Sequence, residues 1–441
     1  MMLAMAFPDV RYARAGGVAI AYQVIGDADE TIVYAPHLTN IYLLWQGKYT
    51  ARFLQRLTEG ARLIVFNPRG TGLSDRPRNV TLEARMDDVT AVLDAEGLGR
   101  ATLFGVGESA NVCALYAATF PERCERLVLF SPYARLTRSE TYPAGISEDE
   151  ALARMRATRE QWGERPFLRA IAAAVDPRLL ENEEDFDWFV WMHRLSASPA
   201  AAADWVRMAI ETDITDVLGS IRVPTLVLHR EDASEDALFV AERIPRVTVR
   251  QLGGVGIGPY DDAAADALLA FVHGNAALAV PDTILTTVLF TDIVGSTDIA
   301  VELGDRRWAE TLDEHHRAVR RTLATFRGLE VDTAGDGFFC RFDGPARAIA
   351  CARVIVEDAR QAGLQIRAGV HTGECELRGD KVAGLAVHVG ARVAAAATAG
   401  EVLVTQTVCD LVAGSDLIFE DRGEHQLRGI PHRWHLYAAT G

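Results

Sequence analysis

Two aspartates, Asp292 and Asp336, occur where predicted strands run into glycine-bearing turns. Asp292 belongs to the apolar segment Leu289–Ile293, shortly before Gly295, and Asp336 lies between the two glycines of Thr333–Phe339. Carboxylates presented at strand ends are what a pair of divalent metal ions needs when it handles a nucleoside triphosphate. A single aspartate in a turn more often caps or solvates that turn, but two in such settings favour metal-assisted chemistry on phosphates.

The sequence around these aspartates predicts the elements that position them. A strand at 286–292 is followed by a helix at about 308–326 and a hairpin with arms at 330–333 and 338–342. A helix at 345–362, a strand at 366–371, a helix at 386–398 and strands at 401–405 and 434–438 come next. This order is typical of a ferredoxin-like α+β domain, which we expect over residues 284–441.

Residues 1–275 show a different pattern, in which short β-branched segments alternate with helical ones. The strand candidates are 18–24, 31–35, 63–66, 101–104, 126–130, 225–228 and 247–252. This alternation favours a parallel α/β sheet. Between about 135 and 215 the strand signal stops, which predicts a helical lid over the carboxyl edge of the sheet. Residues 276–283 are predicted to form a linker.

The bulk composition is that of an ordinary globular protein. The chain has 441 residues, of which 49% are hydrophobic and 24% charged, so two or three domains can each bury a core. A net charge of −16 argues against a nucleic-acid or anionic-membrane partner. Neither a signal peptide nor an apolar stretch of about 20 residues is found, and the six cysteines lack zinc spacing. We therefore expect a cytoplasmic protein without a membrane partner.

The segments Leu289–Thr297 and Thr333–Phe339 resemble the class III nucleotidyl cyclases, which make cyclic AMP or cyclic GMP. The resemblance covers about residues 284–438. It implies that Asp292, Asp336 and the backbone carbonyl of Ile293 bind Mg²⁺ or Mn²⁺, two ions per active site. Metals in such a site lower the pKa of the ribose hydroxyl and neutralise phosphate charge.

The helix at 384–392 resembles the family segment that carries the transition-state pair, an asparagine and an arginine one turn later. Arg392 stands at the arginine position, where a guanidinium would reach the α-phosphate. His388 replaces the asparagine and can still donate a hydrogen bond to the ribose. Residues four apart lie on one helical face. Arg428 stands where the family usually has a lysine on the triphosphate.

The positions that select the base depart from the family. Asp332 stands where adenylyl cyclases usually have a lysine, and Lys381 aligns with the usual aspartate or threonine. The exchanged pair could satisfy the adenine edge from swapped sides, or the two residues could form a salt bridge that occupies the base pocket. The resemblance implies ATP as the substrate, with GTP as the alternative.

In this family the metal ligands of one site and its base and transition-state residues come from different subunits. This chain carries both sets, so the resemblance implies a head-to-tail homodimer with two equivalent sites. It also implies that whatever reorients the first domain can shift the catalytic interface.

The first domain resembles the α/β-hydrolases over about residues 12–275, lid included, on the segments 66–75 and 103–110. That family places its serine nucleophile on a strained strand-to-helix turn, the nucleophile elbow. Here Gly107 occupies the serine position and Ser109 that of the following glycine. Gly256 stands at about the place of the histidine base, and Asp232 matches the region of the acid.

A glycine cannot attack a carbonyl, and nothing near Ser109 can activate it. We therefore expect a non-catalytic α/β-hydrolase-like domain that senses an unidentified small apolar ligand, with His37 and Glu108 lining the cavity. A purely structural remnant is the alternative. The whole chain is predicted to be an adenylate cyclase, a phosphorus–oxygen lyase. A double pseudoenzyme that binds ligand and nucleotide, or an esterase with an unusual nucleophile, are competing hypotheses.

Overall fold

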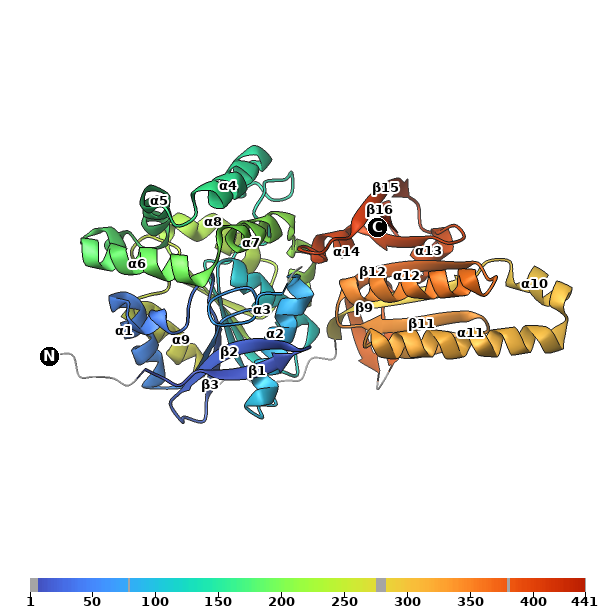
Figure 1. The fold of residues 1–441 in the computed structure, drawn as a ribbon, viewed down its shortest axis with the longest axis horizontal. Coiled ribbons are helices and arrows are strands. Elements are labelled where there is room, and N and C mark those ends of the chain that lie inside the picture. The colour runs from blue at the N-terminus through green and yellow to red at the C-terminus, as the bar shows by residue number, and fades with distance from the viewer. Residues whose placement is uncertain (1–6, 78–79, 275–282, 379–380, 441) are drawn as a thin grey trace. The chain divides into compact units, whose positions relative to one another are not determined.

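The computed structural model describes residues 7–77, 80–274, 283–378 and 381–440 (Figure 1). Residues 7–274 form one compact unit, and residues 283–440 form a second. No helix within these described ranges combines the length and apolarity needed to cross a membrane.

The first unit is built on an eight-stranded sheet in the order β1-β2-β4-β3-β5-β6-β7-β8. The strands are β1 (Arg11–Ala15), β2 (Val18–Ile25), β3 (Thr31–Ala35), β4 (Arg62–Phe66), β5 (Ala101–Val106), β6 (Cys124–Phe130), β7 (Thr225–His229) and β8 (Val247–Gln251). β1 and β2 are antiparallel to their neighbours, while β4, β3, β5, β6, β7 and β8 run parallel. The parallel sheet inferred from the alternating pattern is confirmed.

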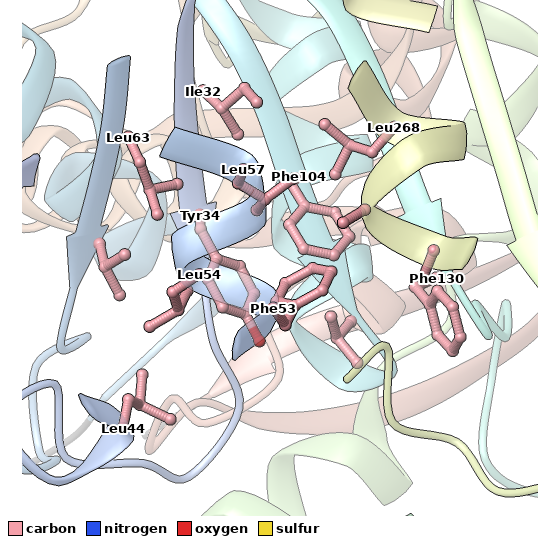
Figure 2. Close-up of a cluster of buried hydrophobic side chains, with 14 of the residues drawn as sticks. Ile32, Tyr34, Leu44, Phe53, Leu54, Leu57, Leu63, Phe104, Phe130 and Leu268 are labelled. Carbon is pink, nitrogen blue, oxygen red and sulfur yellow. The ribbon is translucent and has the colours of Figure 1, made fainter. Parts of the chain in front are cut away.

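The central strands β3 and β5 are buried along their whole length, as expected when helices cover both faces of a parallel sheet. Helices α1 (Lys48–Thr58) and α9 (Asp262–Val272) supply part of that cover. Phe53 of α1 packs against Tyr34 and Phe104, whose rings stack with centroids 4.7 Å apart (Figure 2). Such buried aromatic pairs add about 0.5–1.5 kcal/mol beyond the burial of their area.

Four helices lie between β6 and β7, where the strand signal stops: α4 (Glu148–Gln161), α5 (Arg165–Val175), α6 (Glu183–Ser196) and α7 (Pro199–Glu211) (Figure 1). Three begin at residues that cap a helix with a side-chain oxygen, namely Ser147, Asn182 and Ser198. The carboxyl end of α5 meets the loop after β8, where Ile257 N donates to Ala174 O at 3.0 Å. These helices therefore lie at the carboxyl edge of the sheet.

The second unit has a sheet in the order β10-β11-β9-β12-β14-β16-β15, with β13 paired to β12. Its strands are β9 (Thr283–Ile293), β10 (Leu329–Ala334), β11 (Gly337–Phe342), β12 (Ile366–Arg378), β13 (Lys381–Ala383), β14 (Val402–Thr405), β15 (Ile418–His425) and β16 (Trp434–Thr440). Its helices are α10 (Ser296–Leu303), α11 (Asp305–Thr325), α12 (Pro345–Gln361), α13 (Leu385–Ala396) and α14 (Gln406–Leu411). Strand, helices, hairpin, helix and strand follow in the predicted order.

Helix α13 packs closely on the central strands because glycines stand at the crossing points. A Cβ added at Gly369 of β12 would overlap the backbone of Ala394 in α13. A Cβ at Gly390 of α13 would lie 2.6 Å from Cγ2 of Val288 in β9. Glycine at these two positions sets the distance between helix and sheet, and thereby where the residues of α13 stand relative to the end of β9.

Replacing Gly369 should therefore be costly although the change is a single methyl group. We expect Gly369→Ala to lower the free energy of unfolding of the second unit by about 1–3 kcal/mol, because the added carbon forces the helix off the strand. Denaturant unfolding followed by circular dichroism measures this. Gly99→Ala is the control, because its Cβ would meet no heavy atom within 4 Å. An unfolding curve for Gly369→Ala that overlays that of Gly99→Ala would contradict the close packing.

Candidate functional site

Asp292 and Asp336 are brought together at one end of the central strand β9. Asp292 is the penultimate residue of β9, and Asp336 lies in the turn between β10 and β11. The backbone N–H of Ile293 donates to Oδ2 of Asp336 at 3.3 Å. Gly335 has φ +64°, which lets the turn carry Asp336 back toward β9. The two carboxylates predicted to act together thus belong to one site.

The structure adds Arg367 to this site. Arg367 of β12 is the register partner of Asp292 across the antiparallel pair β9–β12. Its Nε donates to Oδ2 of Asp292 at 3.0 Å, and Nη1 donates to the carbonyl of Ala395 in α13 at 3.4 Å. The sequence did not predict Arg367 as a site residue, because only the strand register places it opposite the aspartate and it belongs to no local motif.

A pocket of about 320 Å³ opens beside the ion pair. Its polar lining comes from Asp292, Asp332 and Arg367, together with Thr291. Its apolar wall is formed by Phe290, Phe338 and Phe339 and by alanines of α13, namely Ala391, Ala394 and Ala395. The rings of Phe290 and Phe339 stack with centroids 4.5 Å apart. Asp332, predicted at the base-reading position, therefore shares a pocket with a predicted metal ligand.

The predicted transition-state residues lie elsewhere on the unit. Arg392 and His388 are both exposed on α13, and neither is among the residues that line the pocket beside Asp292. Arg428 is exposed in the turn after β15. The backbone of Lys381 begins β13 and pairs with Arg378, while its side chain lies outside the described part of the structure.

His315 of α11 is buried behind the hairpin that carries Asp336. Its ring meets that of Phe338 edge-on, with centroids 6.1 Å apart. Burial lowers the pKa of His315 to about 4, and the neighbouring His316 adds to the shift. The imidazole is therefore neutral near pH 7 and packs as an apolar ring against the wall of the pocket.

The oxygen donors present fit a Mg²⁺ or Mn²⁺ ion that also binds a nucleotide. Within the described residues no cluster of three or more metal-ligating side chains occurs, so these side chains alone do not complete a coordination shell. Magnesium usually takes only one or two carboxylates and completes its shell with waters and substrate phosphates. Asp292, Asp336 and the carbonyl of Ile293 supply that number of ligands, provided that Arg367 releases Asp292.

In the first unit, the turn after β5 keeps the strained backbone of a nucleophile elbow. Gly107 has φ +55° and ψ −120°, and its N–H donates to Phe130 O at 2.9 Å. A Cβ added there would meet no heavy atom within 4 Å. Ser109 is buried, and its hydroxyl donates to the carbonyl of Ala35 at 2.6 Å. Its role is to hold the first turn of α3 (Glu108–Thr119) against β3.

The loop that would carry a histidine base is closed by the lid. Gly256 has φ +101°, and its N–H donates to Oδ2 of Asp232 at 2.8 Å. A Cβ at Gly256 would lie 2.6 Å from the carbonyl oxygen of Val175 in α5. The acid and the loop thus meet as in a triad, but the partner of the carboxylate is a backbone amide and α5 fills the space of a side chain.

Glu108, next to Gly107, is buried in an ion pair with Arg85 of α2 (Leu82–Ala95). Burial pushes the pKa of Glu108 upward, but the charge of Arg85 and the contact with His37 outweigh it, so this pKa lies below its ordinary value. His37 is half-exposed, with Nδ1 3.4 Å from Oε2 of Glu108. The predicted lining residues His37 and Glu108 therefore do contact each other.

Comparison with known proteins identifies a family for each unit. Residues 281–440 match the family described as adenylate and guanylate cyclase catalytic domain, and residues 31–245 match the α/β hydrolase fold. The chain joins an α/β-hydrolase fold to a class III cyclase domain. The resemblances drawn from the two aspartate segments and from the elbow are confirmed at the level of the families.

Individual relatives cover between about a third and a half of this chain. A receptor-type adenylate cyclase of Trypanosoma congolense is 28% identical over 203 residues, which are 34% of this chain and 27% of that protein. A bifunctional esterase/perhydrolase of Acinetobacter calcoaceticus is 27% identical over 229 residues, 49% of this chain and 79% of that protein. The crystal structure of a bromoperoxidase from Bacillus anthracis aligns with a TM-score of 0.53 at 20% identity, over 60% of this chain and 100% of that one, which shows the fold.

The Asp292–Arg367 pair gives a direct prediction about metal affinity. Both side chains are partly exposed, 39% and 32%, so the pair is worth no more than about 1 kcal/mol. A metal ion that displaces Arg367 must overcome that amount. We expect Arg367→Leu to bind Mn²⁺ about three- to fivefold more tightly without nucleotide, as measured by electron paramagnetic resonance.

Arg360→Leu is the matched control, because Arg360 pairs with Glu357 on the exposed face of α12. Its Mn²⁺ affinity should equal that of the unmodified chain. Unchanged or weaker Mn²⁺ binding in Arg367→Leu would show that Arg367 does not compete with the metal for Asp292.

Proposed function

We propose that this chain is an adenylate cyclase that converts ATP to cyclic AMP and pyrophosphate. The observation that carries the proposal is the hydrogen bond from Ile293 N–H to Asp336, which holds the second carboxylate beside the residue that follows Asp292. Together with the cyclase domain family match, it supports Asp292, Asp336 and the carbonyl of Ile293 as ligands of two Mg²⁺ or Mn²⁺ ions. A bound metal would lower the pKa of the ribose 3′-hydroxyl and neutralise phosphate charge.

The residues of this chain would position the substrate for an in-line displacement. The ribose 3′-oxygen attacks the α-phosphorus, forming one P–O bond as the bond to the pyrophosphate oxygen breaks, and the hydroxyl proton leaves to solvent. Arg367 contacts Asp292, so once released from this aspartate it can contact the triphosphate. Arg392 would stabilise the charge that builds on the α-phosphate, and His388 would donate to the ribose.

A second copy of the chain is needed to deliver these last two residues. Arg392 and His388 stand exposed on α13 and outside the lining of their own pocket. In a head-to-tail homodimer, each copy would supply its metal ligands to one site and its α13 residues to the other. Arg428, exposed in the turn after β15, is proposed to meet the triphosphate in the same arrangement.

The identity of the base rests on Asp332 and on the relatives. Two of the curated relatives are receptor-type adenylate cyclases of trypanosomes, which supports ATP. Asp332 presents a carboxylate to the pocket, and a carboxylate accepts from the N6 amino group of adenine. The same carboxylate also accepts from N1 and N2 of guanine, which makes a guanylate cyclase the second candidate. Assays with ATP and GTP separate the two.

The shared-site arrangement predicts complementation between inactive variants. Asp292→Asn and Arg392→Ala should each abolish cyclic nucleotide formation, because every site of either homodimer lacks one half. Mixing them in equal amounts should restore about a quarter of the original activity, since half of the dimers are mixed and each mixed dimer has one intact site. Cyclic AMP is measured by chromatography in Mn²⁺ with ATP, and cyclic GMP in parallel with GTP.

A mixture of Asp292→Asn with Asp336→Asn is the matched control. Both lesions lie in the same half of the site, so no mixed dimer gains an intact one. Activity restored in that control, or none restored in the first mixture, would exclude the shared site. A chain that makes no cyclic nucleotide from either substrate would instead be a pseudoenzyme.

We also propose that the first unit does not hydrolyse esters and instead binds a small molecule that regulates the cyclase. Gly107 at the nucleophile position and Gly256 at the base position carry no reacting group. A Cβ at Gly256 would lie too close to the carbonyl oxygen of Val175, so a side chain there would collide with α5. This supports the proposal that a histidine base cannot simply return to the loop.

Restoring the missing side chains should therefore fail to restore hydrolysis. We expect Gly107→Ser to fold with some loss of stability, because the position is open to a side chain but φ +55° strains any residue other than glycine. The double variant Gly107→Ser/Gly256→His should show no esterase activity above that of Gly107→Ser on p-nitrophenyl acetate. Activity in the double variant that depends on the new histidine would contradict the steric argument.

A further inference from the structure

The elbow of the first unit gathers buried polar atoms that have no hydrogen-bond partner. Sixteen such side-chain atoms occur among the described residues, and seven of them belong to six residues around this turn: Thr39, Arg85, Glu108, Asn111, Ser131 and Trp205. Folded proteins pair nearly all of their buried polar groups. The concentration of unpaired atoms in one place therefore indicates a site that a polar molecule completes.

Sheet topology brings these residues together. Strands β3, β5 and β6 are parallel neighbours, so the loops that follow them meet at the carboxyl edge. Thr39 follows β3, Glu108 follows β5 and Ser131 follows β6. Ser109 ties the elbow to the end of β3, and Gly107 N–H ties it to Phe130 at the end of β6. Helix α7 of the lid adds Trp205.

Four side chains at this edge contact one another in a closed ring. Arg85 pairs with Glu108, and its guanidinium lies 3.7 Å from the centre of the Trp205 ring. The Trp205 ring meets His37 edge-on at 5.2 Å, and His37 returns to Glu108 at 3.4 Å. Within the ring, the indole N–H of Trp205 has no hydrogen bond, and Oε2 of Glu108 faces Nδ1 of His37 at 3.4 Å without a hydrogen bond of good geometry. One is a donor and the other is an acceptor.

The tryptophans of the lid show that an unpaired indole is exceptional here. Trp162 Nε1 donates to the carbonyl of Ala197 at 2.9 Å, and Trp188 Nε1 donates to the carbonyl of Leu43 at 2.9 Å. Trp205 is only 4% exposed and yet donates to nothing. Asn111 is 1% exposed with both amide atoms unpaired. Beside them, the open position at Gly107 leaves space where a serine would stand.

We propose that this elbow binds a small uncharged molecule whose polar end both donates and accepts, as a primary carboxamide does. Its oxygen would accept from Trp205 or Asn111, and its N–H would donate to Oε2 of Glu108. Net charge is disfavoured, because Arg85 and Glu108 already neutralise each other and a further buried charge would lack a partner. The apolar body would lie against the cluster of Leu38, Ala197 and Ala202 around Trp205.

This assignment excludes simple esters and carboxylates as ligands. An ester accepts hydrogen bonds but has none to donate, so Oε2 of Glu108 would gain no donor from it. A carboxylate would meet the carboxylate of Glu108. The proposal rests on the non-hydrolytic role proposed above for this unit, and it distinguishes an amide from the matching ester by the hydrogen atom that only the amide carries.

The test compares three probes of one shape on the full chain, without nucleotide or metal. Benzamide, methyl benzoate and benzoate are titrated by calorimetry. We expect saturable binding of benzamide and at least about tenfold weaker binding of the other two, because each leaves buried groups unpaired. Equal affinities, or no benzamide binding up to its solubility, would overturn the proposal, and in the second case ordered water alone occupies the elbow.

Variants locate the binding. Trp205→Phe removes the indole N–H and keeps an aromatic ring, and it should weaken benzamide about tenfold. Trp188→Phe is the matched control and should bind as the unmodified chain does. Asn111→Leu provides a second variant with little change in volume. Benzamide affinity unchanged in both Trp205→Phe and Asn111→Leu would overturn the assignment. Turnover of methyl benzoate would overturn the non-hydrolytic role instead, so the two failures are distinguishable.

Discussion

The second unit depends on the pairing of β9 with β11 on one side and β12 on the other. That register sets Asp292 opposite Arg367 and Phe290 opposite Phe339, and it ends where Ile293 N–H reaches Asp336. A slip of one residue would turn every side chain of β9 to the other face of the sheet. The carboxylates, the cation and the aromatic wall of the pocket therefore follow from one strand alignment. Glycines at 369 and 390 let α13 close over it.

The first unit has the backbone of a nucleophile elbow although glycine stands at the position of the serine. The positive φ at Gly107 persists, Ser109 still secures the turn, and Asp232 still meets the loop where a base would stand. At the same edge, Glu108 forms a buried ion pair with Arg85, and the Arg85 guanidinium lies over the ring of the lid tryptophan Trp205.

Sequence patterns located buried elements better than exposed ones. The strands at 31–35 and 101–106 are entirely apolar or β-branched and fully buried, and this pattern predicted them. β1 and β15 were missed, because they lie at sheet edges and expose most of their side chains. The helix expected through Trp308 to Phe326 corresponds to α11, and a separate helix, α10, precedes it because Gly304 at φ +75° divides the two.

Among the functional residues, those in local motifs could be predicted from the sequence and those with distant partners could not. Asp292, Asp336, Gly107 and Gly256 stand in local motifs, and local motifs can be recognised in one sequence. Arg367 and Arg85 could not be found, because their partners lie 75 and 23 positions away and only the folded chain pairs them. Hydrogen bonds that link distant segments have no signature in a single sequence.

The two ion pairs that the sequence did not reveal have opposite physical characters, and each suits its site. Asp292 and Arg367 are partly exposed, so their attraction is worth about 1 kcal/mol or less, and incoming metal and triphosphate can separate them. Arg85 and Glu108 are nearly inaccessible, and removing one partner of such a pair costs about 3–5 kcal/mol. The first pair can exchange partners during a reaction cycle. The second pair stays formed when a ligand binds, because separating it would cost more than a small ligand can offset.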